Sequence, residues 1–195
     1  MKIQGVLTYE GVKPPTEFGL FTRRGVEWLR GLGLGVVDCY LRLMPPLSRE
    51  ILVLSRELRQ MAEGDEDVRL LMTIPGVGYY TALLVRAEVG EIGHFTFKER
   101  MASYSGLVPS TKSSGGVTRH GRITREGSWG LRWALVEAAL VHLMYDTPVT
   151  RAYHRIAERR DRKTARVAAA RMLLEVCYSV LRNRRPYYNL LYAQA

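Results

Sequence analysis

The segment Ile74-Pro75-Gly76-Val77-Gly78 constrains the fold of this sequence more than any other feature, because it lies between two stretches with helical patterning. Two glycines around one apolar residue are typical of a tight reversal between helices, since glycine adopts backbone conformations that other residues avoid. Ile74 and Val77 would turn inward and lock the two helices together. The segment therefore predicts a helix-hairpin-helix, with its second helix over Tyr79–Val89.

The glycines also suit an anionic ligand, because they let backbone amides approach a ligand oxygen at the N-terminus of the following helix. Such a nest binds the phosphate backbone of DNA and does not read base sequence. We therefore expect Pro75, Gly76, Val77 and Gly78 to contact DNA. A purely structural turn between two helices is the alternative, and the motif alone leaves it open.

The distribution of charge favours a polyanionic partner. The 195 residues carry a formal charge of +10, with 29 lysines and arginines against 19 acidic residues. Residues 1–97 hold 11 basic and 12 acidic side chains, whereas residues 98–195 hold 18 and 7 and carry all of the excess. Most of the basic side chains are arginines, whose planar guanidinium groups make paired contacts with phosphate. A solvated surface adapted to high temperature is the alternative explanation.

The spacing of apolar residues predicts a mainly α fold. We expect three segments: a helical connector over 1–64, a domain with the helix-hairpin-helix and a Ser/Gly/Arg loop over 65–147, and basic C-terminal helices over 148–195. The loop is expected at 109–127, where serine, threonine, glycine and arginine dominate. Ser128 is expected to cap the long helix that follows.

Within the connector, glycines and prolines predict an irregular chain up to Pro46, interrupted by a short helix near Arg24–Leu29. An amphipathic helix is expected over 47–63, since apolar residues follow one another there at alternating spacings of four and three. They are Leu47, Ile51, Leu54, Leu58 and Met61. This seam suits either a coiled coil or an ordinary helix that packs on a core, and its short length does not separate the two.

Several separate blocks of the sequence, in one order, resemble a known protein family. The upstream blocks are Leu20-Phe21-Thr22, Glu27-Trp28-Leu29 and the hairpin segment, and the later ones are Met101–Pro109, Ser113-Ser114-Gly115-Gly116, Gly121–Arg125 and Leu131–Ala138. Together they resemble the C-terminal transposase domain of the insertion-sequence-110 family, to which the Piv-type DNA invertases are related. The resemblance runs from about Val12 to Tyr145.

The resemblance implies a recombinase that works through two parts. An N-terminal domain resembling Holliday-junction resolvases binds divalent metal, expected to be Mg²⁺, with four acidic residues. A serine of the C-terminal domain attacks DNA and becomes covalently attached to it, and Ser114 takes that position here, with Ser113 as the alternative register. The acidic N-terminal domain has no counterpart in the sequence, so we expect it to be missing and this chain alone to be inactive. The resemblance also implies a homo-oligomer on DNA and, for some members, a guide RNA encoded in the element.

Basic residues around the serine would neutralise the charge that develops on the scissile phosphate. The residues expected to contact DNA there are Lys112, Gly115, Gly116, Arg119, Arg122, Arg125 and Arg132. Further along, Arg151, Arg155, Arg159, Arg162 and Arg166 would share one face if a single helix continued through them. Such a row would follow the backbone of a DNA duplex or of RNA.

Cysteine, histidine and hydropathy patterns exclude several classes of protein. The two cysteines make no disulfide framework, which favours a reducing cytoplasm, and together with the four histidines they show no zinc spacing. No apolar stretch is long enough to span a bilayer, so we expect no membrane partner. We expect no metal or other cofactor in this chain.

Beside the transposase fragment, the second hypothesis is a non-catalytic helix-hairpin-helix module that binds DNA as a remnant or regulator of a mobile element.

Overall fold

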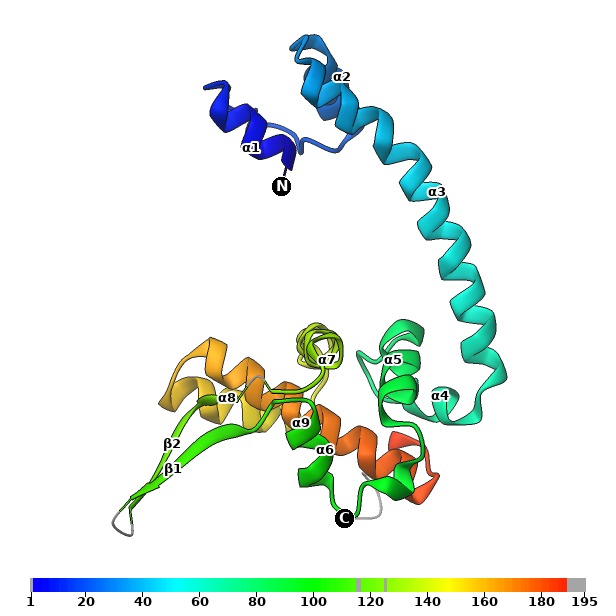
Figure 1. Ribbon diagram of the computed structural model, residues 1–195, viewed down its shortest axis with the longest axis vertical. Helices are drawn as coiled ribbons and strands as arrows, with labels where there is room; N and C mark the ends of the chain where they lie inside the picture. The colour runs from blue at the N-terminus through cyan, green and yellow to red at the C-terminus, as the bar shows by residue number, and fades with distance from the viewer. Residues whose placement is uncertain (1, 115–116, 125, 189–195) are drawn as a thin grey trace. The chain divides into compact units, whose positions relative to one another are not determined.

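The computed structural model describes residues 2–114, 117–124 and 126–188, and its fold is mainly α, as expected (Figure 1). The chain divides into two compact units, Met1–Glu57 and Leu58–Ala195. Each unit has its own group of buried apolar side chains.

The first unit contains helices α1 (Lys2–Tyr9) and α2 (Arg23–Gly31) and the beginning of α3 (Gly35–Gly64). Its core is formed by Ile3, Leu7, Leu20, Leu29, Val37 and Leu41. The short helix expected near Arg24–Leu29 is confirmed as α2, which begins after Thr22, whose hydroxyl accepts a hydrogen bond from the Gly25 amide at 3.2 Å. The expectation that the rest of the chain before Pro46 is irregular is wrong, because α1 and the first part of α3 lie there.

Helix α3 continues through Pro45 and Pro46, so the sequence-based start at residue 47 is also wrong. Proline removes one backbone donor from a helix and costs about 3 kcal/mol in its interior. Both prolines are exposed here, so water can reach the carbonyl groups that lose their helical partners. Apolar residues of α3 before the prolines, Val37 and Leu41, are buried in the first unit and stabilise the helix on that side.

The second unit contains the last turns of α3 and most of the other elements. They are α4 (Glu66–Leu71), α5 (Tyr79–Val89), the 3-10 turn η1 (Ile92–His94), α6 (Lys98–Tyr104), strands β1 (Pro109–Ser114) and β2 (Val117–Ile123), α7 (Trp129–His142), α8 (Pro148–Arg159) and α9 (Arg162–Asn183). The helix expected over Tyr79–Val89 and the cap expected at Ser128 are confirmed. Side-chain caps at Asp65, Thr147 and Asp161 begin α4, α8 and α9 in the same way.

Helix α9 is the centre of the second unit, and α4, α6, α7 and α8 all contact it. Its buried residues combine small alanines, such as Ala169 and Ala170, with the larger Leu173 and Leu174. Alanine at these positions lets neighbouring helices approach closely, and the leucines fill the space that remains. Helices α4 and α5 therefore share one core with the basic helices α8 and α9.

The segment expected to be a loop at 109–127 instead contains an antiparallel pair of strands, β1 and β2, seen in Figure 1 as two green arrows. Ser114 pairs with Val117 and Lys112 with Arg119, and the register is irregular between Pro109 and Thr111. The sequence explains the strands, because Val117, Thr118 and Ile123 are β-branched and favour extended backbone. A Gly-Gly pair in a sequence is also typical of the connection between two strands. Residues Gly115, Gly116 and Arg125 lie outside the described residues.

The single helix that would align the five C-terminal arginines is interrupted. Helix α8 ends at Arg159, and Arg160 has φ −130° and ψ −105°. Asp161 then begins α9, because its Oδ1 accepts hydrogen bonds from the amides of Lys163 at 2.8 Å and Thr164 at 2.9 Å. An aspartate in this position is a strong helix start signal, and it competes with continuation of α8. The condition for one continuous arginine face is therefore not met, and the arginines are divided between two helices.

Candidate nucleic-acid interface

The turn between α4 and α5 is held from inside by its two apolar residues. Ile74 and Val77 are buried, as expected, and the Val77 amide donates to the Ile74 carbonyl at 3.0 Å. Gly76 has φ +83°, a conformation that favours glycine. A Cβ at this position would lie 2.5 Å from the Ala138 carbonyl oxygen and 2.7 Å from the His142 amide nitrogen. The turn thus packs directly on the backbone of α7, and Gly76 makes that approach possible.

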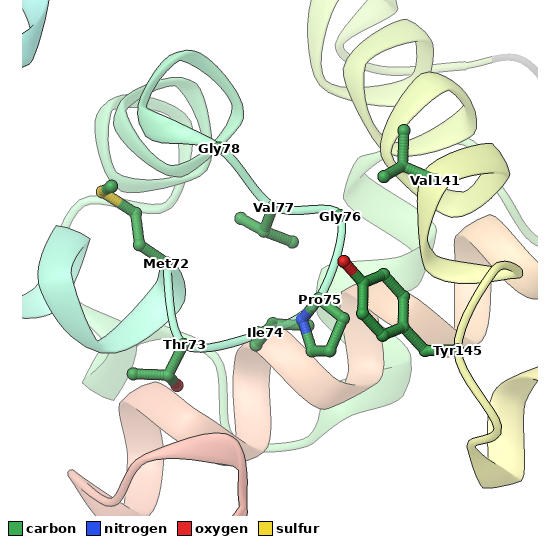
Figure 2. Close-up of a pocket in the computed structure, with 9 residues that line it drawn as sticks. All are labelled: Met72, Thr73, Ile74, Pro75, Gly76, Val77, Gly78, Val141 and Tyr145. Atoms are coloured by element: carbon green, nitrogen blue, oxygen red, sulfur yellow. The ribbon is translucent and has the colours of Figure 1, made fainter.

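Gly78 differs from Gly76 because its surroundings are open. It is exposed, caps α5 with φ −85° and ψ 175°, and a Cβ added there would meet no atom within 4 Å. The first hydrogen bond of α5 joins the Ala82 amide to the Gly78 carbonyl at 2.9 Å, so the earlier amides of the helix have no partner within it. Residues 72–78, with Val141 and Tyr145, line a shallow surface pocket beside this turn (Figure 2).

His142 fixes the turn from the side of α7. The Pro75 carbonyl oxygen lies 2.7 Å from Nδ1 of His142 and can only accept, so Nδ1 carries a proton. Nε2 lies 2.8 Å from the Thr147 hydroxyl, which caps α8. Burial lowers the pKa of His142 and favours the neutral imidazole. One buried side chain therefore joins the turn to the corner between α7 and α8.

This role of His142 was not predicted from the sequence, in which the four histidines were considered only for a zinc spacing that they lack. The signal that would have found it is its position on the apolar face of α7, where it follows Leu131, Leu135 and Ala138 at helical spacing. A histidine on an apolar face is buried, so its ring nitrogens need partners. Thr150 completes the group, since its hydroxyl lies 3.1 Å from that of Thr147 and donates to the Tyr145 carbonyl at 2.7 Å.

A second group of polar contacts holds the base of the β1–β2 hairpin. The Glu88 carboxylate of α5 accepts from the Tyr104 hydroxyl at 2.9 Å and from the Ser128 hydroxyl at 2.7 Å. The hydrogen bond to Glu88 raises the pKa of Tyr104. Since Tyr104 ends α6 and Ser128 precedes α7, Glu88 joins the segments that enter and leave the hairpin. Glu88 was also missed, because a lone glutamate on a helix gives no sequence signal of such a contact.

Arg132 lies at the same hairpin base. Its Nη1 donates to the Ser105 carbonyl oxygen at 2.9 Å, and its side chain is partly buried. The candidate nucleophiles Ser114 and Ser113 are the last two residues of β1, opposite Val117 and Thr118, and Lys112 lies next to them opposite Arg119. Arg122 belongs to β2. The backbone pairing thus places these residues on one two-stranded hairpin.

The C-terminal arginines lie on two neighbouring helices. Arg151, Arg155 and Arg159 are exposed at successive turns of α8, and Arg151 pairs with Asp146 at 2.8 Å. Arg162 is the first residue of α9 and is exposed. Arg166, one turn later, is partly buried, and its Nε is buried with no hydrogen-bond partner among the described residues.

Acidic residues before the turn are engaged in ion pairs. Arg184 contacts Glu66 at 2.7 Å and Asp67 at 3.0 Å, and Arg86 lies 3.4 Å from Asp67 and 3.6 Å from Asp65. These pairs join the end of α9 and the last turn of α5 to the start of α4. Within the described ranges, no group of three histidine, cysteine or acidic residues could hold a metal ion. No helix there is long and apolar enough to cross a membrane.

The fold and the site define a helical domain in which a glycine turn, a serine-bearing β-hairpin and arginine-rich helices are built on one core. Residues 68–155 match the family model described as Transposase IS116/IS110/IS902. The chain therefore carries a transposase domain of the IS116/IS110/IS902 family, which confirms the family resemblance of the sequence.

Individual relatives agree with this assignment. The transposase for insertion sequence element IS1111A of Coxiella burnetii is 33% identical over 135 residues, which are 67% of this chain and 37% of that protein. The insertion element IS110 uncharacterized 43.6 kDa protein of Streptomyces coelicolor is 30% identical over 132 residues, 67% of this chain and 32% of its own length. The pilin gene-inverting protein of Moraxella bovis is 31% identical over 121 residues, 60% of this chain and 38% of its own length. The chain thus spans less than two fifths of each of these relatives.

Proposed function

We propose that this chain is the DNA-binding and serine-bearing part of a transposase or recombinase, and that an acidic metal-binding domain completes its active site. The family domain at 68–155 supports this proposal, as does the similarity to a pilin gene-inverting protein, whose name describes a DNA rearrangement. In this arrangement the turn holds the DNA backbone, and the β1–β2 hairpin brings a serine to it.

The observation that carries the proposal is the contrast between Gly76 and Gly78. Gly76 is fixed against α7 and, through Pro75, against His142, whereas Gly78 is open to solvent at the start of α5. The turn is therefore held in one conformation while the amide groups that follow it have no helical partners. A fixed helix N-terminus with open space before it suits a phosphate group, because its amides and dipole favour negative charge.

The arginines of α8 extend this interface in the proposal. Arg151, Arg155 and Arg159 repeat at intervals of four residues, which places their side chains on one face of the helix. Together with Arg162 they would bind successive phosphates and release counterions, so affinity for DNA would fall steeply with salt. A guide RNA, which the family resemblance implies for some members, is a polyanion that the same row would bind.

Ser114 is the proposed nucleophile, and Ser113 remains the alternative. Its hydroxyl oxygen would form a bond to the scissile phosphorus as the bond from phosphorus to a deoxyribose oxygen breaks, and that oxygen would leave with a proton. A serine hydroxyl needs a base or a metal to lose its own proton. We assign that task to the acidic domain, with its divalent metal, and assign stabilisation of the phosphate charge to the arginines beside the serine.

A covalent-adduct assay tests the serine. The chain, supplied with the acidic domain of a family member and Mg²⁺, is incubated with labelled suicide DNA substrates and separated on a denaturing gel. The wild type should give a labelled protein band that Ser114→Ala abolishes and Ser113→Ala retains, while both variants bind DNA as the wild type does. An adduct that survives Ser114→Ala excludes this nucleophile. DNA binding with no adduct under any condition would identify a non-catalytic binding module instead.

We also propose that a second copy of the chain covers the seam of α3. Leu47, Ile51, Leu54 and Met61 are exposed along this helix, and their alternating spacing is that of a coiled coil. Exposed apolar residues in such a row mark a contact surface, because water does not favour a continuous apolar face.

A further inference from the structure

Three large aromatic side chains gather on the surface of the second unit. Tyr80 of α5 is 49% exposed, and Trp129 and Trp133 of α7 are 71% and 45% exposed. The two indoles are nearly parallel, with 14° between their planes and 6.3 Å between centroids. The Tyr80 ring meets Trp133 edge-on at 6.2 Å. We call these three residues the aromatic cluster.

The core does not explain the exposure of these rings. The buried face of α7 is made by other residues, among them Leu131 and Leu135, which are fully enclosed. Gly130 of α7 approaches Leu84 of α5, so these two helices also pack beside the contact between Tyr80 and Trp133. Two exposed tryptophans on one helix face are unusual for a soluble domain and mark a binding surface.

The position of the cluster indicates its ligand. Tyr80 is the second residue of α5 and follows Gly78 by two positions. The cluster therefore begins directly after the turn at Gly76–Gly78, which is proposed to bind a phosphate. The rings offer flat π faces and, at Tyr80, a hydroxyl group. Nucleobases have flat faces of matching size and stack on such rings regardless of sequence. Bases within a duplex have their faces covered by neighbours, so the matching ligand is a strand with unpaired bases.

The geometry points to a stacking site for unpaired nucleobases, formed by Tyr80, Trp129 and Trp133 beside the glycine turn. This inference rests on the proposed function, since the turn would hold a phosphate of the same strand. It adds a ligand class to that function: single-stranded nucleic acid, or a duplex opened at the recombination site. The excess of basic residues in the second half of the chain supports a nucleic acid over an apolar protein partner for this face.

Tryptophan fluorescence reports directly on this site. The sequence has three tryptophans, so Trp28→Phe leaves only the two of the cluster. In the full chain with this change, an unlabelled 20-nucleotide single strand should quench the emission with saturation at low salt. A hairpin-free duplex of the same length should bind, as followed by anisotropy of a labelled copy, with much weaker quenching. Quenching that is equal for both, or absent for both while they bind, contradicts the stacking site.

Substitutions separate this inference from the proposed function. Trp129→Leu and Trp133→Leu should each weaken single-strand binding by about tenfold or more with duplex binding unchanged, and the unfolding midpoint should stay unchanged for the more exposed Trp129. Trp133→Tyr, which keeps a ring, should restore most of the affinity, and Phe97→Leu, an exposed aromatic on α6's N-terminal side, serves as the matched control.

The outcomes are distinct. Unaltered single-strand affinity in both leucine variants overturns the stacking site and leaves the proposed function standing. A change of oligomeric state in these variants, without a loss of single-strand binding, shows that a second protein copy covers the cluster and also overturns it. Absence of binding to any nucleic acid by the wild type overturns the proposed function itself.

Discussion

Gly76 and Gly78 lie two positions apart in one turn but are glycine for different physical reasons. At Gly76 the backbone has positive φ and the neighbouring α7 backbone leaves no room for a Cβ. At Gly78 the backbone conformation is open to any residue, and no neighbouring atom would contact a Cβ. Folding therefore requires the first glycine, whereas at the second position glycine suits the start of α5 and would also allow a ligand to approach the backbone.

Gly76→Ala should lower the free energy of unfolding by about 2 kcal/mol or more, since it adds backbone strain to a clash with the Ala138 carbonyl. Gly78→Ala, the matched change in the same turn, should alter stability by less than about 1 kcal/mol. Urea unfolding followed by circular dichroism measures both. Equal midpoints for the two variants would show that the turn does not pack on α7 as described.

His142 should make stability depend on pH. Its folded-state pKa lies below the ordinary value of 6.5 because the ring is buried, so the unfolded chain binds a proton more readily. The stabilisation is present above pH 6.5 and is lost as the pH falls through the lower folded-state pKa. Unfolding free energies measured from pH 7.5 to 5 should therefore decrease.

His142→Gln should be less stable at neutral pH and should lose much of this pH dependence, whereas the variant His154→Gln, at an exposed histidine, should keep it. A flat profile for the wild type contradicts the buried neutral imidazole.

At the scale of elements, the serine hairpin owes its position to contacts at its base. Glu88 joins the end of α6 to the start of α7, the Thr124 amide donates to the Val108 carbonyl at 3.0 Å, and Arg132 binds the Ser105 carbonyl. These bonds connect the strands to helices of the main core. The strand that carries the candidate nucleophiles Ser113 and Ser114 therefore extends from a base that is held to the helices of the core.

Glu88→Ala should loosen that base, because the Tyr104 and Ser128 hydroxyls lose their acceptor. We expect a loss of about 1–3 kcal/mol in unfolding free energy. Amide hydrogen exchange should accelerate in β1 and β2 more than in α9. Glu137→Ala, an exposed glutamate of α7, provides the comparison and should change neither. Unchanged exchange in the strands of the Glu88 variant would rule out its positioning role.

The elements differ in how far their sequences reveal them. Local signals suffice for α5 and α7, because the Gly78 turn and the Ser128 cap mark where these helices begin. They mislead at α3, because this helix continues through two prolines, with its earlier residues Val37 and Leu41 buried in the first unit. The β1–β2 pair carried a Gly-Gly signal that the abundance of serine and arginine obscured.

The site itself is predictable only in part. The glycine turn is local, so its residues were found from the sequence. His142 contacts Pro75 from 67 positions away, and Glu88 contacts Ser128 from 40 positions away. Such contacts depend on how helices pack, and a single sequence contains no direct record of that packing. The aromatic cluster was missed for the same reason, since Tyr80 and the α7 tryptophans are neighbours only in the folded unit.

At the scale of the whole molecule, the basic residues and the apolar seam of α3 lie in different parts of the chain and suit different partners. The basic excess lies in residues 98–195, in the unit that carries the transposase domain, whereas the exposed apolar row lies on α3. We propose that the first binds nucleic acid and the second binds another copy. Such separation lets assembly and DNA binding be changed independently.

Leu54→Glu should therefore reduce self-association, because it places a charge in the seam, whereas Leu52→Glu, an equally exposed leucine off the seam, should not. Sedimentation equilibrium of the full chain at several concentrations measures the effect. The wild type and the Leu52 variant should show concentration-dependent dimers or larger species, and the Leu54 variant should be shifted to monomer. A wild type that is monomeric at all concentrations excludes the seam as a self-contact, with or without DNA.

The binding of a labelled DNA duplex, measured by fluorescence anisotropy across a salt series, tests the central claim most directly. We expect wild-type chain to bind at low salt with a steep loss of affinity as salt rises. Gly78→Ala should bind about tenfold more weakly with nearly the same salt slope, because it blocks amide contacts and removes no charge. Gly64→Ala, at another glycine with open surroundings, should bind as the wild type. No binding at low salt, or a Gly78→Ala affinity equal to that of the wild type, would contradict a phosphate grip at this turn.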